Sequence, residues 1–474
     1  MITFIVSIII LFIGYTLYSR LTEAVFHPVG WMTPAMEHSD GVDIVPMKTW
    51  KAFLIQLLNI AGTGPIFGAL MGACFGPVVF LWIVFGAILG GAVHDYMCGM
   101  ISARNNGASI AALSGLYIGE GAMYLMRVFS VLLLLLTGTV FVTSPAALLN
   151  TLTGGRLGSA FWIIVILIYY VLATLLPIDK IIGRFYPIFG VVLIVMAISI
   201  SAAMLVLPQY RIPELVLENL HPENLPVFPF MFITVACGAI SGFHATQCPI
   251  VAKCIVSVKD GRRVFYGAMI AESVIALVWA AAGMAFYGDT AQLQLGLSSI
   301  GQSGVVYNIS KTMLGQVGGI LAIIGVVVCP ITSGDTAFRS ARLILAEWTG
   351  FDQKNLGKRL IITIPLLAAG ALLTQLDFNV LWRYFSWSNQ TLATIALWVA
   401  TVYLLKSERN RIGSLITALP AVFMTAVVTT YIIMADEGLR LPGTVAYPVG
   451  IILAGVLLVL YLTTCVIEKK HEKK

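Results

Sequence analysis

Residues 59–68 read NIAGTGPIFG and interrupt an apolar run, from about residue 53 to residue 75, that is otherwise long enough to cross a bilayer. Three glycines and a proline within ten residues form poor helix, because glycine is flexible and Pro65 has no N–H to donate. Backbone groups left unpaired at membrane depth are costly unless they line a cavity or bind a ligand. The stretch therefore predicts a broken membrane helix of the kind that forms transporter binding sites, with a ligand-free proline kink as the alternative.

The composition is that of a membrane protein. Of the 474 residues, 59% are hydrophobic and only 11% are charged, and the mean hydropathy is +0.94. Soluble proteins carry about 25% charged residues, so most of this chain must face lipid or other apolar helices. Long apolar runs recur without the alternating pattern of an outer-membrane barrel. We predict an all-α polytopic membrane protein.

Several features limit the function classes open to the chain. The seven cysteines lie in or beside apolar runs and form no CxxC pair, which favours small buried residues over a metal or redox site. The chain has no HExxH, no Walker loop and no GxSxG with credible partner residues, which argues against an enzyme. Its net charge of +6 reflects basic loop residues and does not indicate nucleic-acid binding. The first apolar run has no basic residues before it and no cleavage site after it, so we expect a transmembrane helix there.

The apolar runs predict thirteen membrane spans. When alternate loops are assigned to one side, starting after the first span, that side collects 23 of the 28 lysines and arginines. The positive-inside rule then places the N-terminus outside and the C-terminus in the cytoplasm. The longest connections are expected at residues 20–48, 208–227 and 288–314. The expected spans are residues 2–19, 49–74, 77–103, 125–149, 160–177, 185–207, 228–254, 264–287, 315–346, 359–375, 381–404, 413–434 and 445–466.

A second interruption lies in the seventh span, where residues 237–249 read CGAISGFHATQCP. Each interruption opens a block of five spans, and the two blocks cover residues 48–207 and 228–404. Because five is odd, the blocks must have opposite orientations in the membrane, which is the inverted-repeat plan of many transporters. The remaining residues, 1–47 and 405–474, would add one span before the blocks and two after them.

A third correspondence supports the repeat. Residues 143–147, TSPAA, resemble residues 332–336, TSGDT, and each segment lies in the third helix of its block. The offset between these segments is close to the offset between Gly64 and Gly242. We therefore expect two broken helices that meet near the membrane midplane.

Asp335 is the first candidate for an ion-coupling residue, because ionisable residues inside a membrane are costly and usually functional. It lies between hydroxyl-bearing residues and next to a glycine. Carboxylate and hydroxyl oxygens suit sodium, and a carboxylate can also accept a proton. The alternative is an internal ion pair with Arg339, one helical turn away.

Further ionisable residues lie in the third and eighth spans. His94 and Asp95 are neighbours, and since adjacent helical residues point about 100° apart, at most one of them is expected to face the core. A proton relay and a hydrogen-bonded structural pair that stabilises Arg104 are both open interpretations. Glu272 is a second candidate for a coupling carboxylate.

The interruptions also carry polar side chains. His244 lies inside the second one and could titrate near neutral pH. It is one turn from Cys248, which suggests a metal site, but no other close ligands support that interpretation. Gln56 and Asn59 offer amide contacts beside the first interruption.

The eleventh span adds a polar patch below its aromatic start. Ser388, Asn389 and Gln390 follow tryptophan and tyrosine residues of the kind that anchor span ends at the membrane interface. A patch that faces the site is therefore plausible here, beside the ordinary anchoring role of the aromatics.

Several of these segments resemble the carbon starvation protein CstA family. They are residues 40–46, DGVDIVP; 59–68, quoted above; 87–96, AILGGAVHDY; 332–336, TSGDT; and 388–393, SNQTLA. The resemblance covers most of the chain in the same order. This chain is shorter than the long members of that family, and it has Ile55 and Gln56 where they carry a His-His pair.

The resemblance implies a bacterial inner-membrane uptake carrier of the amino acid–polyamine–organocation (APC) superfamily, with a LeuT-like core of five plus five helices. Members of the family are described as peptide transporters or as proton-coupled pyruvate transporters. The two interruptions would be the unwound first and sixth core helices, and the eighth core helix would supply hydroxyls to a sodium site. Half-helix N-termini at the two breaks would favour an anionic carboxylate.

We therefore expect a secondary active transporter that imports a small carboxylate-bearing nutrient, namely a peptide, pyruvate or an amino acid, driven by protons or sodium. A membrane sensor that binds the nutrient without moving it is the alternative. Apart from H⁺ or Na⁺ no cofactor is expected, and the expected partners are the substrate and the lipid bilayer. The candidate substrate-binding residues are Gln56, Asn59, Gly62, Thr63, Gly64, Gly238, Ser241, Gly242, His244, Asn389 and Gln390. The candidate ion-coupling residues are Ala61, Gly62, Asp95, Glu272, Thr332, Ser333, Asp335 and Thr336.

Overall fold

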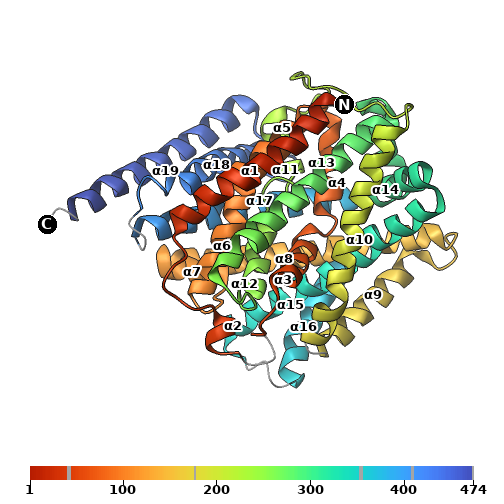
Figure 1. Cartoon of the computed structure of the whole chain (residues 1–474). Helices are drawn as coiled ribbons and strands as arrows, with labels where there is room; N and C mark the ends of the chain where they lie inside the picture. The colour runs from red at the N-terminus through yellow and green to blue at the C-terminus, as the bar shows by residue number, and fades with distance from the viewer. Residues whose placement is uncertain (40–43, 176–177, 352–355, 407–409, 472–474) are drawn as a thin grey trace.

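The computed structural model describes residues 1–39, 44–175, 178–351, 356–406 and 410–471, and the regular elements in these residues are all helices (Figure 1). The elements up to the end of the first block are α1 (Ile2–Phe26), α2 (Pro34–Glu37), α3 (Thr49–Ala61), α4 (Gly64–Gly72), η1 (Ala73–Phe75), α5 (Val79–Leu81), η2 (Trp82–Gly91), α6 (Ala92–Arg104), α7 (Ile110–Tyr117), α8 (Glu120–Leu152), α9 (Gly158–Leu175) and α10 (Ile178–Val206). The later elements are η3 (Val227–Met231), α11 (Phe232–Thr234), α12 (Gly242–Ala252), η4 (Val258–Asp260), η5 (Arg262–Tyr266), α13 (Gly267–Tyr287), α14 (Thr290–Ile323), η6 (Ile324–Val328), α15 (Cys329–Thr349), α16 (Leu356–Leu373), α17 (Phe378–Lys406), α18 (Leu415–Met434) and α19 (Gly443–His471).

Helices occupy all the expected spans, but not every span is a single long apolar helix. Within the described residues nine helices are long and apolar enough to cross a membrane, and the bent pair of α3 and α4 would be a tenth. The span expected at residues 160–177 is the shorter apolar helix α9, and its last two residues lie outside the described ones. The span expected at residues 228–254 is broken in its middle. The protein is a multi-pass membrane protein built from helices.

The first interruption separates α3 from α4, and the two helices are bent by 49°. Helix α3 ends at Ala61, and α4 begins at Gly64 without a side-chain cap and with Pro65 in its first turn. Proline is tolerated there because the first N–H groups of a helix have no partner within the helix. A side chain is not tolerated at Gly62, because a Cβ atom would lie 2.5 Å from Cζ of Phe141.

The second interruption lies between α11, which ends at Thr234, and α12, which begins at Gly242. Asn389 of α17 holds this break in place, because its Oδ1 accepts hydrogen bonds from the Ser241 hydroxyl at 3.1 Å and the Phe243 N–H at 2.6 Å. A Cβ atom at Gly242 would lie 2.3 Å from the carbonyl oxygen of Asn389. Glycine is therefore required for the backbones of α12 and α17 to approach this closely.

The two interruptions touch each other. A Cβ atom at Gly64, in the first break, would lie 2.4 Å from Sγ of Cys237, in the second. The third helices of the two blocks, α8 and α15, also pack along one another. Glycines allow that contact, since a Cβ at Gly138 would meet the ring of Phe338 at 2.4 Å. The core thus brings together elements that are far apart in the sequence.

One expected connection is wrong. The sequence predicts a loop over residues 288–314, but residues 290–314 belong to helix α14. The segment contains glycines and polar residues, which is why its hydropathy is low, yet it is helical apart from Gly301 and Gly315. Both glycines have positive φ angles, 70° and 64°, and break the helix into shorter segments. Residues 20–48 also contain helix, namely the end of α1 and all of α2.

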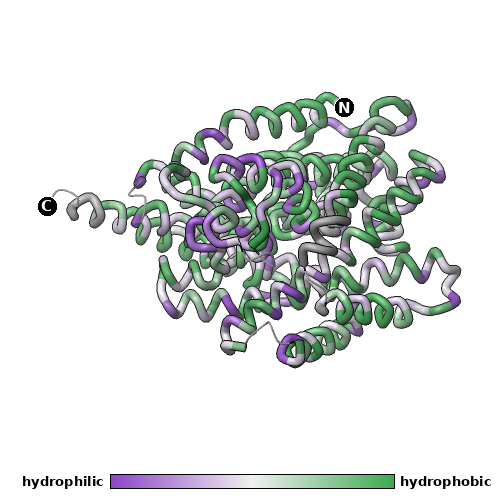
Figure 2. Tube along the Cα trace, turned by 60° about the horizontal axis from the view of Figure 1, so that its bottom comes forward, coloured by the Kyte–Doolittle hydropathy of each residue, from purple (hydrophilic) through white to green (hydrophobic). Residues whose placement is uncertain are grey.

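Helices outside the two blocks cover the core on one side. Helix α1 packs on α13 and η2, while α18 packs on α17 and α19 packs on α18 (Figure 1). Figure 2 shows that the helix starting at the N-terminus is hydrophobic over most of its length. Only 28% of the apolar window of α1 and 17% of that of α19 is buried, so both helices present most of their surface to lipid.

The predicted topology can be tested by cysteine labelling, because six native cysteines are buried and only Cys465 is partly exposed. In a Cys465→Ser background, Arg156→Cys and Thr349→Cys place single exposed thiols in connections expected on opposite sides. We expect a membrane-impermeant maleimide to label Arg156→Cys in intact cells, and Thr349→Cys only after permeabilisation. The opposite pattern would show that the orientation is inverted.

Candidate functional site

A buried network of ionisable side chains lies where the second break meets the first block. It consists of His94 and Asp95 from α6, His244 from α12 and Glu272 from α13, and the exposed fraction of each is 0% or 1%. Charged groups are this deeply buried in a membrane protein only when they are paired or serve a function. The network therefore joins three helices, one from the first block and two from the second.

The Asp95 carboxylate is the centre of this network. Its two oxygens lie 2.8 Å from Nδ1 of His94 and 2.8 Å from Nδ1 of His244. An ionised carboxylate only accepts hydrogen bonds, so each imidazole must carry its hydrogen on Nδ1. The expectation that only one of the neighbours His94 and Asp95 faces the core is wrong, because α6 is buried on all sides from Ala92 to Ala103 and has no exposed face. Arg104 bonds instead to the hydroxyl of Tyr403, at 2.7 Å.

The other ring nitrogen of each histidine points away from Asp95. Nε2 of His94 lies 3.7 Å from Sγ of Cys98. Nε2 of His244 lies 3.3 Å from Oε2 of Glu272, which is within ion-pair distance, but the groups are not aligned for a hydrogen bond. Neither oxygen of Glu272 has a hydrogen-bond partner among the described residues. Glu272 and His244 can therefore exchange one proton: a carboxylic acid facing a neutral imidazole, or a carboxylate facing an imidazolium.

Cys237 adds a third ligand type beside this pair. One donor atom from each of Cys237, His244 and Glu272 lies within 4.8 Å of the others, a spacing that could hold a metal ion. In the sequence the possible second ligand is Cys248, one turn from His244. In the structure the candidate ligands near His244 are Cys237 and Glu272. The Cys248 thiol instead lies 3.7 Å from the Asp95 carbonyl oxygen.

The polar residues near the two breaks differ in how they are paired. The Gln56 amide donates to Sγ of Cys248 at 3.3 Å, and the Gln390 amide donates to the Phe232 carbonyl at 3.1 Å. Asn59 and Thr63 are fully buried, and their side-chain polar atoms have no hydrogen-bond partner among the described residues. Unpaired buried polar atoms beside a helix break are available to a ligand.

Those two residues stand in contrast to Asn389, whose amide is occupied. Its Oδ1 closes the second break, as described above, and its Nδ2 lies 3.5 Å from Sγ of Cys237. Asn389 therefore positions α12 and leaves little of its amide for a substrate. The glycines at the two breaks serve close packing, because a Cβ atom at any of them would lie within 2.5 Å of a side-chain or backbone atom. They are Gly62, Gly64, Gly238 and Gly242.

The Asp335 carboxylate forms the internal ion pair that is one of the two interpretations of the sequence. Its Oδ2 lies 3.3 Å from Nη2 of Arg339, and that nitrogen also donates to the Ala173 carbonyl at 3.1 Å. The neighbouring hydroxyls bond to backbone carbonyls, and the Ser333 hydroxyl donates to the Leu58 carbonyl of α3 at 3.2 Å. The hydroxyls of Thr332 and Thr336 donate within α15 at 2.7 and 2.8 Å, to Cys329 and Ser333.

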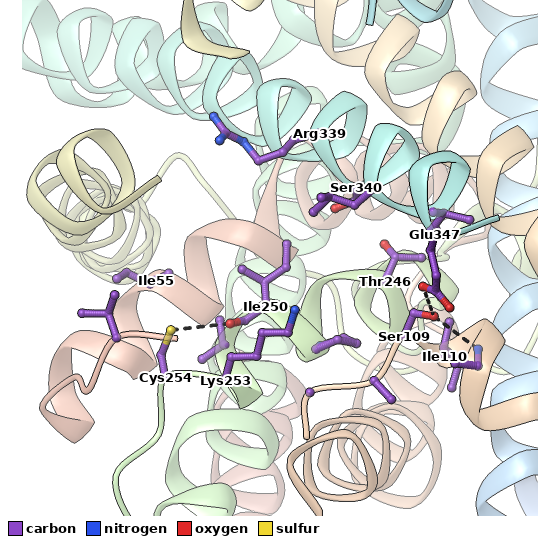
Figure 3. Close-up of a pocket in the computed structure, with 18 of the residues that line it drawn as sticks. Ile55, Ser109, Ile110, Thr246, Ile250, Lys253, Cys254, Arg339, Ser340 and Glu347 are labelled. Carbon is purple, nitrogen blue, oxygen red and sulfur yellow. Dashed lines mark hydrogen bonds between the residues drawn. The ribbon is translucent and has the colours of Figure 1, made fainter. Parts of the chain in front are cut away.

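A vestibule of about 330 Å³ opens on the side predicted to be cytoplasmic (Figure 3). Thr246, Ser340 and Lys253 line it, and Figure 3 shows the Lys253 side chain extending along it. The Gln247 amide donates to the Thr246 hydroxyl at 2.9 Å and to the Ser340 hydroxyl at 3.4 Å. Thr246 lies two residues after His244 in α12, so the vestibule reaches a point less than one helical turn from His244 along that helix.

The connection between the blocks packs against the opposite end of the first broken helix. The Leu220 N–H donates to the Phe75 carbonyl at 3.2 Å, and the His221 ring lies 4.5 Å from the Phe75 ring. Burial lowers the pKa of His221, in this connection, below its usual value. On that side the connection covers Phe75, at the end of the first broken helix.

The sequence does not single out three residues that the structure places in the site. Phe141 contacts both breaks, since it lies over Gly62 and its ring is 6.1 Å from that of Phe243. Cys237 precedes α12, and Lys253 directly follows it. Cys237 could have been found as the first residue of the second interruption, whereas an ordinary phenylalanine in an apolar span gives no signal.

Substitution of Gly242 tests the close contact between the second break and α17. Gly242→Ala is expected to lower the free energy of unfolding in detergent by about 1–3 kcal/mol, because the new methyl group would overlap the Asn389 backbone. Gly121→Ala is the matched control, since nothing lies within 4 Å of its Cβ position and alanine favours helix. Equal melting temperatures for the two variants would contradict the described packing.

Comparison with known proteins places this geometry in a family. A relative from Haemophilus influenzae, named as an uncharacterized membrane protein, is 41% identical and covers 63% of this chain and 95% of its own. The peptide transporter CstA of Helicobacter pylori strain J99 is 26% identical over 83% of this chain and 76% of its own. The pyruvate/proton symporter BtsT of Escherichia coli is 27% identical over 52% of this chain and 43% of its own.

The fold has a solved counterpart. The inward-facing structure of Mhp1 superposes with a TM-score of 0.54 at 16% identity, covering 88% of this chain and 91% of that one, which shows a LeuT-like transporter fold. The sequence profile described as carbon starvation protein CstA matches residues 1–157, 150–289 and 288–431. The chain is thus a transporter rather than an enzyme, and it belongs to the carbon starvation protein CstA family.

Proposed function

We propose that this transporter imports a small carboxylate-bearing nutrient together with protons, and that Asp95, His244 and Glu272 carry the coupling. The observation on which the proposal depends is the chain of contacts from Asp95 through the His244 ring to Glu272. These contacts connect the first block to the second break and to the helix after it. A change in the relative position of the blocks must therefore change these contacts.

His244 and Glu272 share one exchangeable proton. With Asp95 ionised and accepting from two Nδ1–H groups, His244 has one free acceptor, Nε2, facing Glu272. A proton on Glu272 leaves both groups neutral, which is the less costly state in a buried site. Transfer of that proton to Nε2 creates an imidazolium between two carboxylates. A movement of α12 relative to α13 would change the 3.3 Å separation and thereby favour uptake or release of the proton.

A carboxylate substrate suits the groups near the first break. Helix α4 begins at Gly64 with no side-chain cap, and the N-terminus of a helix attracts anions. The unpaired amide of Asn59 and the unpaired hydroxyl of Thr63 lie just before it and could bind the rest of the substrate. Lys253 in the vestibule would attract the same charge on the way to the cytoplasm.

The size of the vestibule favours a small substrate. Its volume of about 330 Å³ is at the lower end of the range for ligand pockets in proteins. Pyruvate or a single amino acid would pass through a vestibule of this size more readily than a long peptide. Names of relatives support both classes, since one is a peptide transporter and another a pyruvate/proton symporter. Competition between labelled pyruvate and dipeptides separates these candidates.

Uptake into proteoliposomes tests the function directly. With an inward proton gradient of one pH unit and labelled pyruvate, amino acids or dipeptides, one coupled proton is expected to drive about tenfold accumulation, because one pH unit is worth about 1.4 kcal/mol. Accumulation that follows a sodium gradient alone would overturn proton coupling. Saturable binding of a carboxylate without gradient-driven uptake or exchange would indicate a sensor instead.

Substitution of Glu272 separates transport from coupling. Glu272→Gln cannot release a proton, so we expect exchange of labelled for unlabelled substrate to continue while proton-driven accumulation disappears. Asp95→Asn is expected to reduce both activities, because it removes the charged acceptor that fixes the His244 ring. Full accumulation by Glu272→Gln would contradict the proposed role.

Asp335→Asn is the matched control for a buried carboxylate outside the network. It leaves Arg339 without its charged partner, so we expect the free energy of unfolding to fall by about 3–5 kcal/mol. The protein that still folds should keep the same dependence on the proton gradient. If its accumulation instead lost that dependence, Asp335 would be part of the coupling site.

A further inference from the structure

A large apolar groove lies on the lipid-facing surface between α1, α3, α10 and α13. Its volume is about 1220 Å³, and its walls are formed mainly by aliphatic and aromatic side chains such as Phe12, Phe53 and Ile198. Phe12 and Ile198 are 58% and 63% exposed, so the groove is open to the membrane. Figure 1 shows α13 between α1 and α10, and residues of all three helices line the groove.

One end of the groove is basic. Lys48, just before α3, and Arg263, in η5, line this end, and both side chains are exposed. Neither forms an ion pair with another described residue, and the described residues lining the groove include no carboxylate. Trp50, beside Lys48, is 60% exposed, as is usual for a tryptophan at the membrane interface. This end lies on the side predicted to be cytoplasmic.

The length of the groove matches one lipid leaflet. From Gly267 to Val278, α13 lines the groove over a stretch of twelve residues, which is about 16 Å of helix from first to last at about 1.5 Å per residue. Half of a hydrocarbon core of about 30 Å is about 15 Å. An acyl chain would thus lie along the apolar wall while its head group reached Lys48 and Arg263.

We propose that this groove is a binding site for one anionic phospholipid of the inner leaflet. The phosphate and any further negative charge of the head group pair with Lys48 and Arg263, and an acyl chain fills the space between α1 and α10. A zwitterionic lipid fills the same apolar space but pairs less well with two unneutralised cations. Basic pockets between membrane helices on the cytoplasmic side favour anionic head groups for this reason.

The position of the site gives it a consequence for transport. Lys48 is the N-cap residue of α3, the half-helix that ends at the first break, and α3 packs on both α10 and α13. A lipid bound at Lys48 would hold the start of α3 against the helices beside it. Its loss is therefore expected to loosen α3 without altering the buried network.

Native mass spectrometry of the purified full chain tests the proposal. The protein is released from micelles that contain equal amounts of phosphatidylglycerol and phosphatidylcholine with identical acyl chains. We expect retention of one phosphatidylglycerol in preference to phosphatidylcholine, and about tenfold weaker retention by the Lys48→Gln/Arg263→Gln variant. Soluble glycerol phosphate should not compete at equal concentration, because it lacks the acyl chain.

Two further variants separate this site from general charge effects. Lys259→Gln/Lys358→Gln removes the same charge from exposed residues that do not line the groove, and it should retain the lipid normally. Ala202→Trp fills the groove while leaving both cations in place, and it should release the lipid. Equal retention of the two lipids, or the same loss in both charge variants, would overturn the proposal whatever the outcome of the transport experiments.

Discussion

The Asp95 carboxylate, held between the Nδ1 atoms of His94 and His244, is the interaction on which the centre of this protein depends. At 2.8 Å on each side, the two N–H groups compensate a charge that is otherwise very costly to bury. The same contacts fix the orientation of both imidazole rings. They also determine that Nε2 of His244 faces Glu272, so the position of one carboxylate decides which atom can receive a proton.

This arrangement requires the two broken helices to meet closely. The contact of Gly64 with Cys237 and the contact of Gly242 with the backbone of α17 leave no room for a Cβ atom. Asn389 then holds the start of α12, and His244 lies two residues beyond that start. The glycines therefore allow the helices to approach closely, and Asn389 fixes the position of the start of α12. This places His244 beside Asp95 and Glu272. Phe141 fills the remaining space between the two breaks.

Much of the fold could be predicted from the sequence because its signals are strong and local. NIAGTGPIFG contains residues that weaken a helix within a run that must be apolar, and the distribution of lysine and arginine gives a topology. Residues 290–314 of α14 are expected as a loop because their glycines and polar residues resemble one, although most of this stretch is helical. The weak helix propensity of these residues is overridden by the packing of α14 against neighbouring helices.

The site was harder to predict, because its pairings depend on contacts between distant residues. Asp95 and His244 are 149 positions apart, and nothing in the sequence shows that their side chains meet. Asp335 had the clearest sequence signal, since it lies among hydroxyls inside a span, but it forms an ion pair with Arg339 one turn away. Sequence position identifies buried charges, whereas only the fold shows which of them are already neutralised.

We propose that Glu272 holds the proton that moves with the substrate. Infrared difference spectroscopy, comparing the protein before and after addition of a transported carboxylate, measures this through the C=O stretching band of a protonated carboxylic acid. We predict that the substrate shifts or removes such a band in the wild-type protein, and that the change is absent in Glu272→Gln. A band that changes identically in both proteins, or no carboxyl change in a protein that is transporting, would contradict the account.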